Sequence, residues 1–329
     1  MLRKAININE IFFEAHNNLG ILLQDLGRYE EAEKEYRKAI EINPNYEYTH
    51  NNLGNLLVEL KRYEEAEKEY RKATELNPDY AKAHNNLGLL LQELGRYEEA
   101  EKKYRKAIEI NPGYEYANNN LGMLLQALKR YEEAEKEYRK ALKLNPDDAY
   151  LHYTIGNLME YSKRYEEAEK EYRKAIELNP DDANLRYRMG VFYEHNADGI
   201  RYGKGFKIHD AIKEYSKAIE LNPEYINANM NLSELYFIKK DYEKSLELAE
   251  NALKISKTPY DKIISKFLIL INLISIGRSY DIDGFIKYLK ENRGYMVTYV
   301  FEGIKNAVRG MGCEDKILDL IDKIEEFKG

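Results

Sequence analysis

An Asn-Pro pair recurs along the chain at a fixed spacing, and this repeat constrains the fold more than any other feature. The prolines follow one another at steps of 34 residues, and then after one step of 43: Pro44, Pro78, Pro112, Pro146, Pro180 and Pro223. A glycine precedes each of the first five at one constant interval: Gly20, Gly54, Gly88, Gly122 and Gly156. Periods of about 20 to 50 residues are typical of chains that stack one structural unit, so the sequence predicts an array rather than a single globule.

Each period contains two amphipathic segments, which predict a pair of helices. In the second period these segments run from residue 48 to 60 and from 63 to 76, with Lys61-Arg62 as the turn. Gly54 has no Cβ, so the second helix can approach the first closely. Pro78 has no backbone N–H, so the second helix ends before it. Because no pair can bury its apolar face alone, each pair must stack on the next.

The block NNLG, followed by RYEEAEKEYRKAIELNP, resembles the tetratricopeptide repeat. The resemblance implies an all-α, right-handed superhelical solenoid of antiparallel helix pairs. It divides the chain into seven units: 13–46, 47–80, 81–114, 115–148, 149–182, 183–225 with an insertion, and 226–259. Residues 1–12 are then the remnant second helix of an abbreviated repeat, and residues 260–329 form degenerate helical repeats that end in a capping helix.

Composition excludes several functional classes. The chain has 51 Lys and Arg against 58 Asp and Glu, a net charge of −7, and therefore lacks the basic excess that a nucleic-acid partner requires. Its single cysteine, Cys313, cannot form an internal disulfide, and no apolar run approaches the roughly 20 residues of a membrane span. We therefore expect a cytoplasmic protein without membrane contact. The abundance of Lys and Glu is thermophile-like.

The family resemblance also indicates a binding surface, because in these proteins the ligand lies in the concave groove lined by the first helix of each pair. There the first four units carry asparagine pairs: Asn17 and Asn18, Asn51 and Asn52, Asn85 and Asn86, Asn119 and Asn120. An amide donates and accepts, so it can pair with the backbone of an extended peptide. Units about 10 Å apart would place one asparagine at roughly every third peptide residue. The second asparagine of each pair resembles the ladder asparagines of superhelical members of the family. The alternative is that asparagine is simply common at this position.

Aromatic and basic residues extend the predicted groove: Tyr48, Tyr116, Tyr150, Tyr153, Asn157, Tyr187 and Arg188. Tyrosine offers a large contact area with a polar tip, which suits recognition, although some of these rings could instead fill space between units. The family's carboxylate-clamp members, which hold acidic chaperone tails, need a lysine where this chain has Asn17 and Asn51. A chaperone-tail receptor is therefore disfavoured.

Histidines recur at one position of the first helix: His16, His50, His84 and His152. Being one unit apart, they cannot converge on one ion, so packing or hydrogen bonding explains them better than a metal site. No metal or other cofactor is expected.

One insertion interrupts the period. Nine extra residues lie within 195–207, a glycine-rich segment with four basic or aromatic residues: Arg201, Tyr202, Lys204 and Phe206. It is either a partner-contacting loop or a tolerated insertion at a surface turn.

The sequence thus predicts a protein–protein interaction scaffold that holds an extended segment of a partner and catalyses nothing, since no catalytic constellation is present. Two alternatives remain open: a structural array that self-associates end to end through the N-terminal half repeat, and an accessory platform for a separately encoded enzyme.

Overall fold

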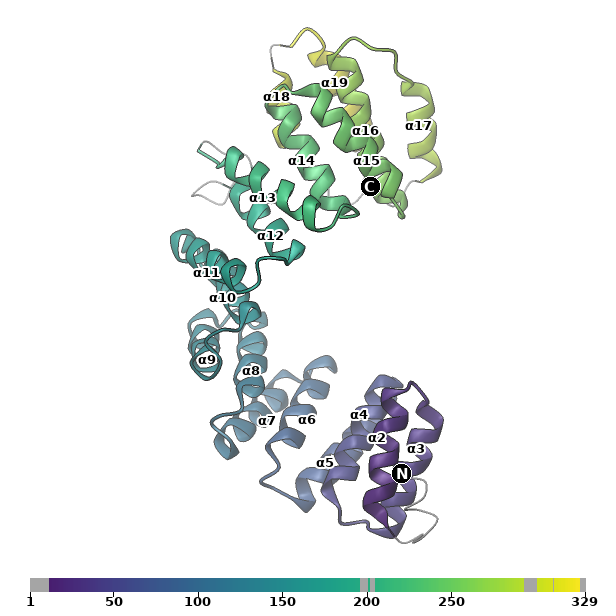
Figure 1. The fold of residues 1–329 in the computed structure, drawn as a ribbon, viewed down its shortest axis with the longest axis vertical. Coiled ribbons are helices and arrows are strands. Elements are labelled where there is room, and N and C mark those ends of the chain that lie inside the picture. Colours follow the sequence, from purple (N-terminus) through teal and green to yellow (C-terminus); the bar gives the residue numbers. More distant parts are fainter. Residues whose placement is uncertain (1–11, 196–200, 202–204, 293–300, 310, 326–329) are drawn as a thin grey trace. The chain divides into compact units, whose positions relative to one another are not determined.

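The computed structural model describes residues 12–195, 201, 205–292, 301–309 and 311–325. In this part of the chain every regular element is a helix, and neighbouring helices form pairs (Figure 1). The all-α fold expected from the sequence is therefore confirmed. Residue contacts divide the chain into two compact units, residues 1–151 and 152–329, and their boundary falls within α10 (Ala149–Tyr161). The expected remnant helix at 1–12 lies outside the described residues except for Phe12.

The first unit consists of four helix pairs that follow one another in sequence order. Their bounds are α2 (Phe13–Asp25) with α3 (Tyr29–Ile42), α4 (Glu47–Glu59) with α5 (Tyr63–Leu76), α6 (Ala81–Glu93) with α7 (Tyr97–Ile110), and α8 (Glu115–Ala127) with α9 (Tyr131–Leu144). We call the first member of each pair helix A and the second helix B. Within a pair A packs against B, and α3, α5 and α7 each also pack against the helix A that follows.

A glycine–tyrosine contact sets the distance between the two helices of each pair. A Cβ added at Gly54 would lie 2.6 Å from the Tyr70 ring, well inside van der Waals contact. The same clash would arise at Gly88, where the ring of Tyr104 lies 2.7 Å from the added atom. The absence of a side chain at these glycines is thus what allows a buried tyrosine of helix B to cover helix A.

The turn between A and B needs one residue with a left-handed backbone. Glycine supplies it at Gly27 and Gly95, with φ of 70° and 74°. Lysine occupies the equivalent place at Lys61, Lys129 and Lys163, with φ between 58° and 60°. Each of these lysines carries a Cβ in a conformation that glycine adopts more readily.

Helices B of adjacent pairs are joined by a closed ring of two arginines and two glutamates. Arg96 lies 2.8 Å from Glu67 and 2.7 Å from Glu99, while Arg71 contacts the same two carboxylates at 2.7 and 3.3 Å. Burial opposes the ionisation of Glu67, but hydrogen bonds from Arg71 and Arg96 outweigh it and keep the pKa of this carboxyl below its ordinary value. Equivalent rings flank this one in the sequence: Arg37, Arg62, Glu33 and Glu65, and Arg105, Arg130, Glu101 and Glu133.

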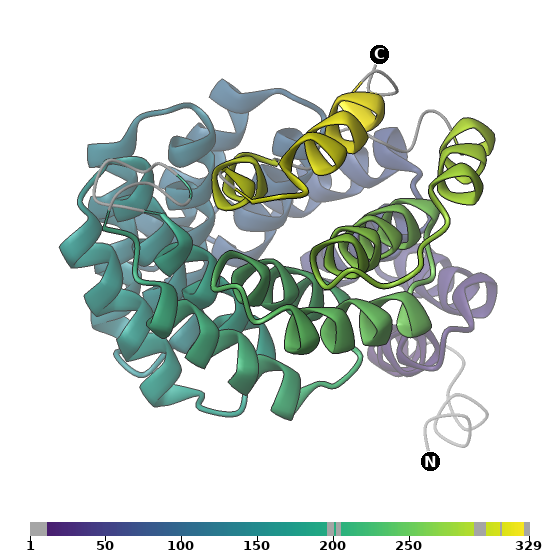
Figure 2. The same ribbon diagram turned by 90° about the horizontal axis from the view of Figure 1, so that it is seen from above.

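The second unit continues with helix pairs and ends in a different core. Its helices are α11 (Tyr165–Leu178), α12 (Ala183–Glu194), α13 (Ile208–Leu221), α14 (Ile226–Ile238), α15 (Tyr242–Ile255), α16 (Pro259–Ser275), α17 (Ile282–Glu291), α18 (Glu302–Val308) and α19 (Glu314–Glu325). The insertion separates α12 from α13. One apolar cluster contains side chains of all helices from α14 to α19, including Ile317, Ile321 and Ile324 of α19. Helix α19 lies beside α18 (Figure 2).

Candidate functional site

The asparagines of the helices A form hydrogen bonds from one pair to the next. Asn52 Nδ2 donates to Asn17 Oδ1 at 3.1 Å, and Asn86 Nδ2 donates to Asn51 Oδ1 at 3.0 Å. Asn120 Nδ2 donates to Asn85 Oδ1 at 2.9 Å. From the second helix pair onward, the second asparagine of a helix A thus donates to the first asparagine of the preceding helix A. We call this set the asparagine row: Asn17, Asn18, Asn51, Asn52, Asn85, Asn86, Asn119 and Asn120.

The members of the row differ in how much of each side chain remains available. Asn17, Asn51 and Asn85 are buried, Asn18 is exposed, and the others are half-buried. Within the described residues, Asn51 Nδ2 and Asn119 Oδ1 have no hydrogen-bond partner although both atoms are shielded from solvent. These two atoms are unsatisfied but shielded, and most of the other amides of the row already bind one another. This mutual pairing was not anticipated from the sequence.

Exposed aromatic and apolar side chains flank the asparagine row. On α8, Tyr116, Asn120 and Met123 stand at i, i+4 and i+7 and so share one helix face. Tyr116 is 62% exposed and Met123 is 40% exposed. The corresponding residues of other helices A are also exposed: Ile21, Tyr48, Leu89 and Tyr150. Each helix A therefore presents a polar stripe with large uncharged side chains at its edges.

The tyrosines of the predicted groove fall into two groups. Tyr48 is exposed and packs against the rings of Tyr46, at a tilt, and of Tyr80, edge to face, with ring centroids 5.2 and 4.9 Å away. Tyr153 and Tyr187 of the second unit are half-buried. They pack on helix-B tyrosines, Tyr153 at 5.9 Å from Tyr172 and Tyr187 at 5.6 Å from Tyr215. The rings of the second group fill space between helices as well as facing outward.

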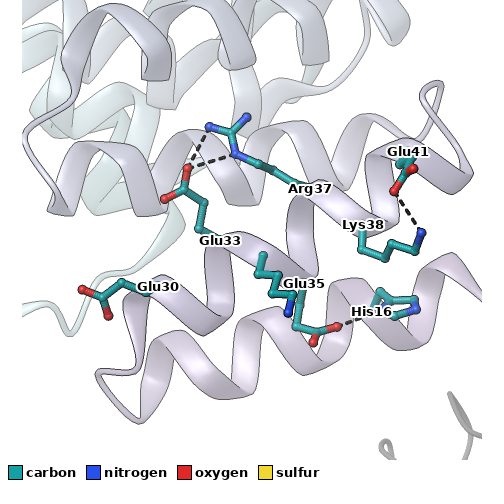
Figure 3. A pocket seen from close by; sticks show the side chains of 8 residues that line it. His16, Glu30, Glu33, Glu35, Arg37, Lys38 and Glu41 are labelled. Carbon is teal, nitrogen blue, oxygen red and sulfur yellow. Dashed lines mark hydrogen bonds and ion pairs between the residues drawn. The ribbon is translucent and has the colours of Figure 1, made fainter.

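The recurrent histidines pair with a carboxylate on helix B of the same pair. His16 Nδ1 lies 2.6 Å from Glu35, and the equivalent contacts are His50 to Glu69 at 2.6 Å and His152 to Glu171 at 2.7 Å. Figure 3 shows the first of these at a depression of about 840 Å³, where His16 from α2 meets charged residues that all come from α3. In the described part of the chain no three His, Cys, Asp or Glu side chains gather to hold a metal ion.

The third pair departs from this pattern, because Lys103 stands where the others have a glutamate. His84 is buried, and its Nε2 lies 3.0 Å from the Pro78 carbonyl oxygen, while its Nδ1 has no partner within the described residues. Burial is the largest cause that lowers the pKa of His84, and the charge of Lys103 adds to it.

Arg201 of the insertion is engaged inside the protein. Its Nε lies 2.7 Å from Glu194 of α12, and its Nη2 lies 3.2 Å from Glu234 of α14. Both carboxylates are buried, at 1% and 0% exposure. Phe206 is half-buried, whereas Tyr202 and Lys204 lie outside the described residues. Arg201 thus joins two helices, and Lys207 at the end of the segment forms an ion pair with Glu169 of α11 at 2.6 Å.

Family comparisons agree with the helix pairs. Five family models, each described as a tetratricopeptide repeat, match residues 51–115 and 200–261, 12–79, 91–158, 149–182 and 171–198. The chain is a tetratricopeptide repeat protein. No curated protein matches it.

Solved structures share the tetratricopeptide repeat fold with this protein. The C-terminal part of a repeat-containing protein from Cytophaga hutchinsonii is 20% identical, with a TM-score of 0.59 over 73% of this chain and 95% of that one. PilF of Pseudomonas aeruginosa is 23% identical, with a TM-score of 0.54 over 64% and 92%. PilW, a type IV pilus biogenesis factor, is 18% identical, with a TM-score of 0.56 over 65% and 94%. At these identities the likeness concerns the fold.

The helices that the structure describes in this tetratricopeptide repeat protein are too short or too polar to cross a bilayer. Among those that the structure describes, none combines the length and the apolar character that a membrane span requires.

Proposed function

We propose that this protein binds an extended segment of another protein along the helices A of its first unit. The observation that carries the proposal is the asparagine row with its flanking exposed side chains. An amide row can pair with a peptide backbone whatever its sequence, and adjacent tyrosine, leucine and methionine side chains supply apolar contact. We propose binding, rather than catalysis, as the role of this surface.

The chemical contrast between the two kinds of helix supports this choice of surface. On α4 and α8 the central residues are chiefly amides and apolar residues, with a tyrosine near the start of each helix, whereas α5, α7 and α9 carry the arginine–glutamate rings. Charged side chains that already satisfy one another offer little to a partner and are strongly hydrated. Uncharged exposed side chains next to amides lose less on dehydration, so the helix-A surface is the better binding surface.

The test is to select peptides from a random linear library on the immobilised full chain and to measure their affinity in solution. The variant that combines Asn52→Ala with Asn86→Ala is expected to bind the selected peptides about 5- to 150-fold more weakly, because each of the two lost amide pairings costs about 0.5–1.5 kcal/mol. Asn45→Ala, at an exposed turn position, is the matched control and should bind normally.

Two results would count against the proposal. One is that no peptide is enriched on the full chain. The other is that the double variant, shown by circular dichroism to be folded, binds the enriched peptides as tightly as the Asn45→Ala control does.

A further inference from the structure

Helix α2 exposes an apolar surface that the equivalent helices of the first unit bury. Leu22 is 46% exposed, whereas the residues at its position in the next three helices A are fully or almost fully buried: Leu56, Leu90 and Leu124. Leu26 follows one turn later on the same side of the helix and is 61% exposed. Phe12, directly before α2, is 43% exposed. We call these three residues, Phe12, Leu22 and Leu26, the α2 end face.

The other helix pairs show what kind of element covers this position. Each of the buried leucines lies on a helix A against which the preceding helix B packs: α3 against α4, α5 against α6, and α7 against α8. Helix α2 packs against α3 and α4, which follow it, and no helix precedes it in the part of the chain that the structure describes (Figure 1). The element that fits the α2 end face is therefore a helix in the position of a helix B.

Arg28, at the turn after α2, shows which charge such a helix must carry. Its Nε and Nη2 donate to Glu31 at 2.7 and 2.5 Å. In the next three pairs the Nη1 of the equivalent arginine also donates to a glutamate of the preceding helix B: Arg62 to Glu33 at 2.8 Å, Arg96 to Glu67 at 2.8 Å and Arg130 to Glu101 at 2.6 Å. Among the described residues Arg28 Nη1 has no such acceptor, and the side chain is 44% exposed. One guanidinium donor thus remains open to a carboxylate at a defined place.

We propose that the α2 end face binds an amphipathic helix of a partner protein that has the residue pattern of this chain's helices B. Such a helix would remove Leu22 and Leu26 from water, as happens to the equivalent leucines of the other pairs. A glutamate at its fifth position, where Glu33 stands in α3, would accept the hydrogen bond from Arg28 Nη1. This partner is helical and needs no asparagine, so the inference stands apart from the binding of an extended segment.

The probe is a synthetic peptide with the sequence of α3, residues 29–42, which packs against α4 in the protein. A lactam bridge between the side chains of Glu30 and Lys34, both exposed in α3, holds the peptide helical, because an isolated helix of this length is otherwise marginal. Its binding to the full chain is measured by fluorescence anisotropy. We expect Leu22→Asp to weaken binding at least tenfold, since the helix would cover an unpaired carboxylate. Leu144→Asp is the matched control, because Leu144 is 44% exposed in the same unit, and it should bind as wild type does.

A second comparison tests the pairing with Arg28. Changing the peptide's Glu33→Gln should weaken its binding to the wild-type chain about fivefold. In the Arg28→Gln variant the same change in the peptide should alter binding less than about twofold, because the glutamate no longer has its partner. Arg28 and Leu22 are both exposed, so these variants are expected to fold.

Four results would overturn the inference. The peptide does not bind the full chain, or it binds Leu22→Asp as tightly as Leu144→Asp. Leu22→Asp lowers the Tm of the chain alone much more than Leu144→Asp does, which would mean that other residues of the chain already cover this face. The chain self-associates in sedimentation velocity runs and Leu22→Asp abolishes this, which would mean that a second copy covers it. Peptides selected for the asparagine row should bind Leu22→Asp normally in every case, so failure of this inference leaves the proposed function intact.

Discussion

His84 of the third helix pair, which lacks the carboxylate partner of the equivalent histidines, gives the sharpest stability prediction. Replacing Lys103 by glutamate should create the ion pair that His16, His50 and His152 already make. In wild type the Pro78 carbonyl can only accept a hydrogen bond, so His84 Nε2 carries the proton and Nδ1 is a lone pair without a donor. The introduced carboxylate would instead bind a proton on Nδ1 and stabilise the imidazolium.

The expected gain follows from the burial of the existing pairs. At His50 and Glu69 the two side chains are only 7% and 18% exposed, so solvent screens their interaction weakly. A charged hydrogen bond contributes about 1.5–3 kcal/mol, and part of this is lost to desolvation of the two charges. We expect a net stabilisation of about 1–2 kcal/mol, which corresponds to a rise in Tm of about 2–8 °C for a cooperative unit of this size.

The pH dependence of the contribution of His84 to folding stability should reverse in the Lys103→Glu variant. The lowered pKa of His84 means that its neutral form stabilises wild type above the unfolded value near 6.5, and that this stability is lost as pH falls through that range. In Lys103→Glu the pKa of His84 should be raised. The pair is then fully formed below about pH 6.5 and is lost as pH rises through the raised value. The difference between the two proteins should thus grow from about pH 8 to about pH 6, and shrink again below about pH 4.5 as the introduced carboxylate is protonated.

The assay is thermal and urea unfolding of both proteins at pH 5, 6, 7 and 8. Lys102→Glu makes the same charge change at an exposed neighbouring position and controls for net charge. If Lys103→Glu and Lys102→Glu show the same Tm at every pH, the histidine–carboxylate explanation is wrong.

Two other substitutions test the packing and the insertion. Gly88→Ala places a Cβ 2.7 Å from the Tyr104 ring and should destabilise the first unit by about 1–3 kcal/mol in urea unfolding, whereas an unchanged midpoint would mean that the helices separate without cost. Arg201→Ala leaves Glu194 and Glu234 buried without their arginine and should destabilise the second unit by about 3–5 kcal/mol at pH 7; a loss below about 0.5 kcal/mol would show that the insertion is passive.

The repeated features of the fold could be predicted because they follow from local chemistry that recurs in every period. Within one period the glycine allows the two helices to approach, the turn joins them and the proline ends the second helix, as at Gly54, Lys61 and Pro78. The partner of the glycine was less visible: the ring of Tyr70, rather than a small residue alone, covers Gly54. The period contained this signal, since a tyrosine follows each glycine at the same interval in the first five units.

Contacts between one helix pair and the next could not be predicted from the 34-residue period. The period shows which residues are equivalent in successive helix pairs. It does not show that Asn52 donates a hydrogen bond to Asn17 of the preceding pair instead of facing solvent. The insertion has no counterpart in the other repeats, so nothing in the sequence indicated that Arg201 pairs with two buried carboxylates. Lys103 differed visibly from the glutamate of other units, yet its effect became clear only when His84 was seen to lack a partner.

The central claim, that an extended segment binds to the helices A, is tested most directly by tyrosine footprinting of the full chain with and without a selected peptide. Tyr48 of α4 and Tyr97 of α7 are both 42% exposed, one on a helix A and the other on a helix B, and Tyr116 of α8 is more exposed. We expect the peptide to protect Tyr48 and Tyr116 from hydroxyl-radical oxidation and to leave Tyr97 unchanged. Protection of Tyr97 with no change at Tyr48 and Tyr116 would contradict the claim.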